Sequence, residues 1–246
     1  MGYVGVVVVM IAICGWLVVR RSMLGTHRDK ELTTALSALS VAFLLSLPAT
    51  NDPLDQALGG VSAVNTFSHC LICLCGWLMA RSFFASSAGN GAGWARSWGV
   101  LAFGIIGTII SWLASAVFLG QPRVVHDSLL SAPYWTFTLT PYLVMLAPSL
   151  RAPGQVRRWV SGRGKGWSRG MLMGSYGVAA LAYSDIAVGL AVLWVAEIFP
   201  EPHLVALREV MIYLGPFLLL SALMLCPVST RFEGRLRPGR ARTARR

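Results

Sequence analysis

Long apolar segments alternate with short polar ones along the chain. The apolar segments cover about residues 2–19, 31–49, 61–80, 99–119, 131–150, 171–199 and 205–226. A helix needs about 20 residues to cross the hydrocarbon core of a bilayer, and most of the segments are close to that length. The pattern therefore predicts an all-α fold, a polytopic membrane bundle of seven transmembrane helices within residues 1–226. The basic segment 227–246 is expected to be a disordered cytosolic tail.

Polar and small residues recur along one side of the third apolar segment. Ser62, Asn65, His69, Cys73 and Gly76 follow one another at spacings of three and four. Residues with these spacings share one face of a helix. Because lipid offers no hydrogen-bond partners, this face has to lie against protein or water. The third helix is therefore expected to pack against neighbouring helices.

Prolines and glycines predict where the other helices end or bend. Pro48 is expected to end the second helix, and the acidic segment 50–60 is predicted to be a turn-rich connection. Pro141 is predicted to kink the fifth helix near its middle, and Gly215-Pro216 to break the seventh. Tyr134 and Trp135, near the start of the fifth helix, have the positions of interfacial anchors. These aromatic residues are common where a helix enters a membrane.

The charged residues predict how the chain is oriented. Only 13% of the residues are charged, and the net charge is +11. If the N-terminus is outside, nineteen of the 21 basic residues fall on the inner side, as the positive-inside rule requires. Arg20 and Arg21 follow the first apolar segment, which predicts a retained anchor rather than a cleaved signal peptide. Orientation accounts for the basic charge, so nucleic-acid binding is not expected.

The segment 151–170 is expected to be a cytosolic loop that is strongly basic. It contains six basic residues and no acidic residue. Basic segments beside a membrane attract anionic lipid headgroups. The residues predicted to contact such headgroups, or a protein partner, are Arg157, Arg158, Arg163 and Lys165.

Three polar residues are candidates for an intramembrane site. Asp185 falls near the centre of the sixth segment, where an acidic side chain costs about 3 kcal/mol to insert. His69 lies at a similar depth in the third segment, and Asn65 precedes it by one turn. We expect Asp185 and His69 to face each other or to share a polar cavity. Two interpretations stay open: a proton or cation site, or a buried hydrogen-bonded pair that fixes helix packing.

Several chemistries are not expected. The five cysteines all lie in apolar segments, and no second cluster completes a metal site with Cys70, Cys73 and Cys75. Both lysines are in loops, which excludes a retinal linkage within a helix. His69 is the only histidine at membrane depth, so axial haem ligands are missing. We therefore predict no enzymatic activity, no metal and no cofactor.

One stretch is similar to a known group of proteins. The residues that carry the likeness are AFLLSLPA at 42–49, Asp55-Gln56, Gly60, Asn65 and His69. This pattern resembles actinobacterial seven-helix integral membrane proteins regarded as transporters or membrane regulators. The likeness covers mainly residues 31–81. In those proteins a cytosolic C-terminal domain follows, whereas this chain has about twenty tail residues, and no functional residue can be carried over from them.

The predicted function follows from architecture more than from chemistry. We expect a multi-pass protein of a bacterial cytoplasmic membrane that regulates, senses or scaffolds without catalysis. The alternative is a small-solute or proton-coupled transporter that uses Asp185 and His69. The lipid bilayer and a protein partner are the expected contacts, and the sequence leaves the oligomeric state open.

Overall fold

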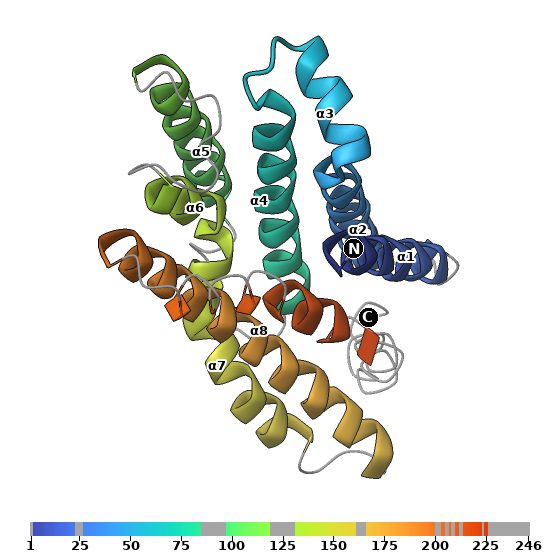
Figure 1. Cartoon of the computed structure of the whole chain (residues 1–246). Coiled ribbons are helices and arrows are strands. Elements are labelled where there is room, and N and C mark those ends of the chain that lie inside the picture. Colours follow the sequence, from blue (N-terminus) through green and yellow to red (C-terminus); the bar gives the residue numbers. More distant parts are fainter. Residues whose placement is uncertain are drawn as a thin grey trace, which may run out of the picture.

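The computed structural model describes residues 2–22, 27–84, 97–118, 131–160, 166–199 and, within 203–225, all but 205, 206, 208, 209, 212, 213 and 223. The fold is all-α, as predicted, and these residues contain no strand (Figure 1). The helices are α1 (Gly2–Ser22), α2 (His27–Ser46), α3 (Pro48–Ala57), α4 (Ala63–Phe84), α5 (Trp98–Phe118), α6 (Ser131–Thr138), α7 (Thr140–Val160) and α8 (Gly166–Ile198). The described residues of 203–225 are also helical.

Several helices are suited to a bilayer. Within the described ranges, Trp98–Ala116 of α5 and Met173–Ile198 of α8 are long and apolar enough to cross one, and α2 with α3 could form a third, bent span. Val4–Val19 of α1 and Ala63–Met79 of α4 are apolar but shorter. Isoleucine, leucine and phenylalanine side chains are exposed along α5, from Phe103 to Leu113, which suits contact with lipid. These features indicate a membrane protein.

The helix α4 lies in the middle of the packing. It contacts α2 on one side and α5 on the other, and α6 and α7 pack against it as well (Figure 1). Three residues of its predicted polar face, His69, Cys73 and Gly76, are buried, whereas Phe67 on the opposite face is exposed. Asn65 is half-buried, and Ser62 lies before the helix begins. The main hydrophobic core forms around α4 and includes the fully buried Trp77.

The predicted kink in the fifth segment is confirmed as a break between two helices. α6 ends at Thr138 and α7 begins at Thr140. Pro141 cannot donate to the carbonyl oxygen of Phe137, four residues before it. Threonine hydroxyls bond to other carbonyl oxygens around the break: Thr136 to Ala132 at 2.7 Å, Thr138 to Tyr134 at 3.0 Å and Thr140 to Thr136 at 2.9 Å. Such hydroxyl bonds accompany bends in apolar surroundings.

Two connections predicted to be irregular are helical instead. Residues 48–57 form α3, so the prediction of a turn-rich segment is wrong for most of its length. Pro48 stands in the first turn of α3, where the missing N–H would have no helical partner anyway and where the fixed φ favours a helix. Residues 151–160 continue α7 rather than starting a loop. Ala152 is buried in the core there, so tertiary packing extends the helix past Pro148 and Pro153.

The expected break at Gly215-Pro216 is also wrong. The chain is helical without interruption over residues 214–222. Pro216 removes one backbone donor, but the residues around it pack tightly: Gly215, Leu219 and Leu220 are buried. Packing therefore stabilises a helix that the local sequence disfavours.

Candidate functional site

His69 occupies the buried side of α4 and has a side-chain partner on α6. It is 7% exposed, and its Nδ1 atom lies 2.6 Å from the hydroxyl oxygen of Tyr134. The phenol can donate this hydrogen bond to an unprotonated Nδ1, which is compatible with a neutral imidazole. The ring of Trp135 lies 4.5 Å from that of His69. The Tyr134 hydroxyl and the Trp135 ring therefore both lie against this buried imidazole.

Tyr134 was expected to be an anchor at the membrane interface; its side chain faces the interior of the bundle, and its depth in a membrane stays a prediction. Its side chain is 1% exposed and packs edge-on against His69. Thr66, on α4, is the other hydrogen-bonding neighbour of the phenol. Asn65 lies one turn before His69 on the same helix and is half-buried. The polar stripe of α4 therefore meets a polar patch on α6.

A second polar contact joins α5 to α6 nearby. The hydroxyl oxygens of Thr108 and Thr138 lie 3.1 Å apart, and both residues are fully buried. Gly104 and Gly107 on α5 allow this approach: a methyl group on Gly104 would lie 3.0 Å from the carbonyl oxygen of Phe137, and one on Gly107 would overlap the Phe137 ring. Glycines at such positions bring helix backbones close together in membranes.

Asp185 lies on α8 and faces a different neighbour, the helical segment 203–225. It is 9% exposed. A methyl group on Gly215 would lie 3.0 Å from the carboxyl oxygen Oδ2. That oxygen has no hydrogen-bond partner among the described residues. One turn further, Gly189 leaves room for Met211 of the same segment.

The structure gives His69 and Asp185 separate partners. Helices α6 and α7 pack against both α4 and α8. The Trp135 ring lies tilted beside His69 and packs against a small cluster that includes Leu190 and Leu193 of α8. The Tyr142 hydroxyl of α7 donates to the Ile72 carbonyl oxygen of α4 at 3.0 Å. A direct contact between His69 and Asp185 is not among the contacts of the described residues. His69 and Asp185 therefore lie in one bundle, His69 against α6 and Asp185 against the segment 203–225.

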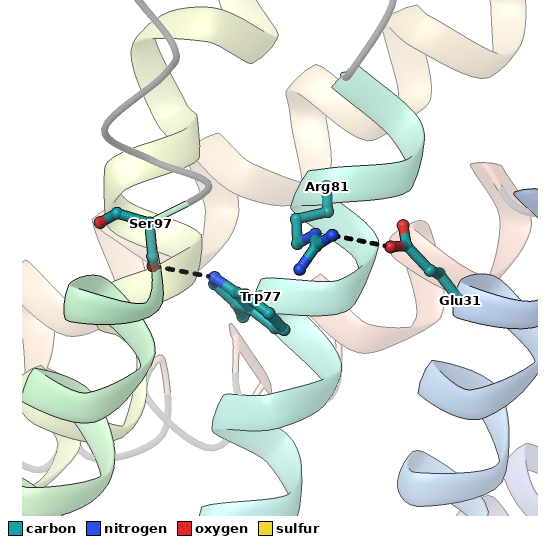
Figure 2. A network of polar contacts seen from close by, with 4 residues as sticks. All are labelled: Glu31, Trp77, Arg81 and Ser97. Atoms are coloured by element: carbon teal, nitrogen blue, oxygen red, sulfur yellow. Dashed lines mark hydrogen bonds and ion pairs between the residues drawn. The ribbon is translucent and has the colours of Figure 1, made fainter.

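The Arg81 end of α4 holds a network that the sequence analysis did not anticipate (Figure 2). Arg81 forms an ion pair with Glu31 of α2, with an N–O distance of 3.0 Å. Its guanidinium carbon also lies 4.6 Å from the ring centre of Trp77. The indole nitrogen of Trp77 donates to the carbonyl oxygen of Ser97, just before α5, at 3.1 Å. One Arg and one Trp thereby connect three helices at one end of the bundle.

The sequence did contain a signal for this network. Glu31 begins the second apolar segment and Arg81 follows the third, so an antiparallel arrangement places both at the same end. Nothing in the spacing shows that the two side chains meet, because that depends on how the helices rotate about their axes.

Only some of the four basic residues predicted to contact headgroups or a partner lie within the described part of the chain. Arg157 is exposed on α7. The side chain of Arg158, and residues Arg163 and Lys165 altogether, lie outside the described residues. Within the described part, no group of three or more His, Cys, Asp or Glu side chains could hold a metal ion.

Comparison of the chain with family models, with curated proteins and with solved structures finds no match.

Proposed function

We propose that this chain is a seven-span protein of a bacterial cytoplasmic membrane, with its N-terminus outside and its C-terminus inside. The apolar helices and the distribution of the basic residues support this arrangement. The Arg81 network supports it further, because arginine and tryptophan side chains favour the membrane interface and here mark one end of three helices. Reporter fusions near Arg157 and at the C-terminus are expected on the same side of the membrane. Opposite sides would contradict the topology.

Within that membrane, the chain acts as a regulatory or scaffolding component rather than an enzyme. The observation that carries this proposal is the closed polar contact between α4 and α6. His69 is bonded to Tyr134 and enclosed by Trp135, and the Tyr142 ring occupies the space beside Gly76. A carrier needs polar groups that reach water near the midplane.

The functional contacts of such a component are on its basic face. Arg151 and Arg157 are both exposed in the second half of α7. Exposed arginines bind carboxylates and phosphates through paired hydrogen bonds. We therefore place a protein partner or anionic lipid headgroups on this surface.

A photo-crosslinking amino acid at position 157 tests the proposal in native membranes. We expect one defined protein adduct that disappears when Arg151 is changed to Glu. Leu150 is exposed on the same helix and is the matched control, because an apolar exposed position should yield no specific protein adduct. Equal crosslinking at 150 and 157 would contradict a partner on the basic face.

A proton-coupled carrier remains the second candidate because of one observation. The Oδ2 atom of Asp185 is buried without a hydrogen-bond partner among the described residues, and ionisable groups at membrane depth often mark ion pathways. Asp185→Asn should then abolish pH-dependent flux in vesicles, whereas Asp55→Asn, outside the core, should preserve it. Equal flux in both variants and in the unchanged protein would count against the carrier.

A further inference from the structure

The short helix α3 separates its polar and apolar side chains onto two sides. Successive residues of a helix turn by about 100°. The polar side contains Asn51, Asp52, Asp55 and Gln56. The other side contains Ala49, Pro53, Leu54, Ala57 and, just after the helix end, Leu58, with Thr50 as its one polar residue. An amphipathic helix of this kind normally buries its apolar side against the protein.

In α3 the polar side is the one that contacts the protein. The side-chain amide of Asn51 donates to the carbonyl oxygen of Leu45 in α2 at 2.9 Å. The carboxylate of Asp55 accepts a hydrogen bond from the backbone of Ser62 at 3.0 Å. In contrast, Leu54 is 44% exposed and Leu58 is 60% exposed. Asn51 and Asp55 are half-buried, whereas Ala49, Pro53 and Ala57 are exposed like the two leucines, so the apolar side is the one turned away from the rest of the chain.

The direction of α3 fits a surface position. The axes of α2 and α3 meet at an angle of 79°. If α2 crosses the bilayer, α3 then lies close to the plane of the membrane surface. Val41 and Leu44, on the last turns of α2, are exposed as well, so apolar surface continues from α2 towards α3. Asp52 and Gln56, on the polar side, are exposed and available to water.

The turn after α3 returns the chain to the bundle. Gly59 and Gly60 have φ angles of 92° and 71°, which glycine adopts without strain. The backbone N–H of Gly60 donates to the Asp55 carbonyl oxygen at 2.7 Å. Trp112 of α5 donates to the carbonyl oxygen of Val61 at 2.8 Å and holds the end of this turn. The turn therefore fixes the position of α3 relative to α5 and to the start of α4.

We propose that α3 is an interfacial helix on the outer leaflet, with Leu54 and Leu58 inserted at the boundary between headgroups and acyl chains. The occupant of its apolar side is lipid, because that side continues the exposed apolar surface of α2. This inference rests on the proposed membrane topology. A crossing position for α3 is disfavoured, because Asp52 and Asp55 would then enter the hydrocarbon region. Helices of this type lie in the interface with the apolar side down.

An environment-sensitive fluorescent amino acid, placed at one position at a time, tests the inference in the full chain. The positions are 54, on the apolar side, 56, the matched exposed position on the polar side, and 106, an exposed isoleucine of α5. The chain is reconstituted in phosphatidylcholine–phosphatidylglycerol vesicles, and bromine-labelled lipids and aqueous iodide serve as quenchers. We expect lipid quenching at 54 to exceed that at 56 by about twofold or more, and strong iodide quenching at 56.

Three results would overturn the inference. If position 54 is as open to iodide as position 56 while 106 is quenched by lipid, α3 is a solvated helix and the membrane topology survives. If 54 is quenched best by bromines near the bilayer centre, α3 is part of a crossing span. If 54 is protected from both quenchers, protein covers it. Iodide quenching at 106 would instead contradict the proposed membrane span of α5. Position 106 therefore distinguishes a failure of the proposed topology from a failure of the inference about α3.

Discussion

The middle of the bundle and the Arg81 end of α4 both contain polar side chains, but they differ in their access to water. In the middle, His69 and Tyr134 are almost fully buried, and the His69 Nδ1 atom lies 2.6 Å from the Tyr134 hydroxyl oxygen. At the Arg81 end, the ion pair with Glu31 is similarly close at 3.0 Å, yet the two side chains are 32% and 37% exposed. The two contacts have similar distances, but only the pair at the Arg81 end is open to water.

This difference decides how much each contact stabilises the fold. A buried polar group that loses its partner stays unsatisfied, because neither lipid nor core offers a replacement. A half-exposed group that loses its partner regains water. Pairs at exposed positions accordingly contribute between 0 and about 1 kcal/mol. We expect the middle of the bundle to be sensitive to small changes and the Arg81 end to tolerate them.

The largest effect is expected for Gly215→Val. The first added carbon would lie 2.8 Å from Ile186 and 3.0 Å from the Asp185 carboxyl oxygen. The segment 203–225 would have to move away from α8, and overpacking of this kind costs about 3 kcal/mol in the free energy of unfolding. The measurement is SDS-induced unfolding in mixed micelles, followed by circular dichroism.

Gly177→Ala is the matched control for this change. Gly177 lies on α8, and nothing is within 4 Å of the carbon that alanine would add. Alanine favours a helix over glycine by about 1 kcal/mol, so this variant should be as stable as the unchanged protein or slightly more stable. If Gly215→Val unfolds at the same SDS fraction as Gly177→Ala, the close contact at Asp185 does not hold these helices together.

A smaller effect is expected for Tyr134→Phe. The substitution keeps the ring and removes the hydroxyl that bonds to His69. Interhelical hydrogen bonds in membranes contribute about 0.6 kcal/mol on average and about 1.7 kcal/mol at most. We expect a loss of about 1 kcal/mol, because both partners are buried.

A double-mutant cycle with His69→Leu separates the bond from other effects of the ring. In the absence of His69, removing the Tyr134 hydroxyl should cost clearly less than in its presence. Additive losses from the two changes would show that the hydrogen bond contributes nothing, and the contrast between the middle and the Arg81 end would lose its main support.

Much of this fold was predictable because it depends on local sequence. Apolar runs of helical length predicted the helices, and Pro141 predicted the break before α7 through its missing N–H. Two local signals failed where packing outweighs them. Helix α7 continues past Pro153 because Ala152 is buried, and the segment at Gly215-Pro216 stays helical against α8. A proline weakens a helix but cannot end one that neighbouring helices hold in place.

The burial of the polar residues was predictable, but their partners were not. Asp185 and His69 are both buried, as their positions in apolar segments implied. His69 lies on α4 and Asp185 on α8, and α6 and α7 pack against both of these helices. The sequence pattern could not show this packing, because it does not determine which helices become neighbours. Tyr134 looked like an interfacial anchor from its place near a segment end. Only the packing of α6 on α4 shows that it is the partner of His69.

The smallest effect is expected at the Arg81 end and gives the sharpest test of the comparison. Arg81→Gln removes the charge that pairs with Glu31, and Arg81→Lys keeps it. A cycle between Arg81→Gln and Glu31→Gln should give a coupling of about 0.5 kcal/mol, and added salt should weaken it because water reaches the pair. Arg81→Lys should keep most of the coupling but lose part of the contact with the Trp77 ring. A coupling as large as that of His69 with Tyr134, and insensitive to salt, would mean that this end is as dry as the middle.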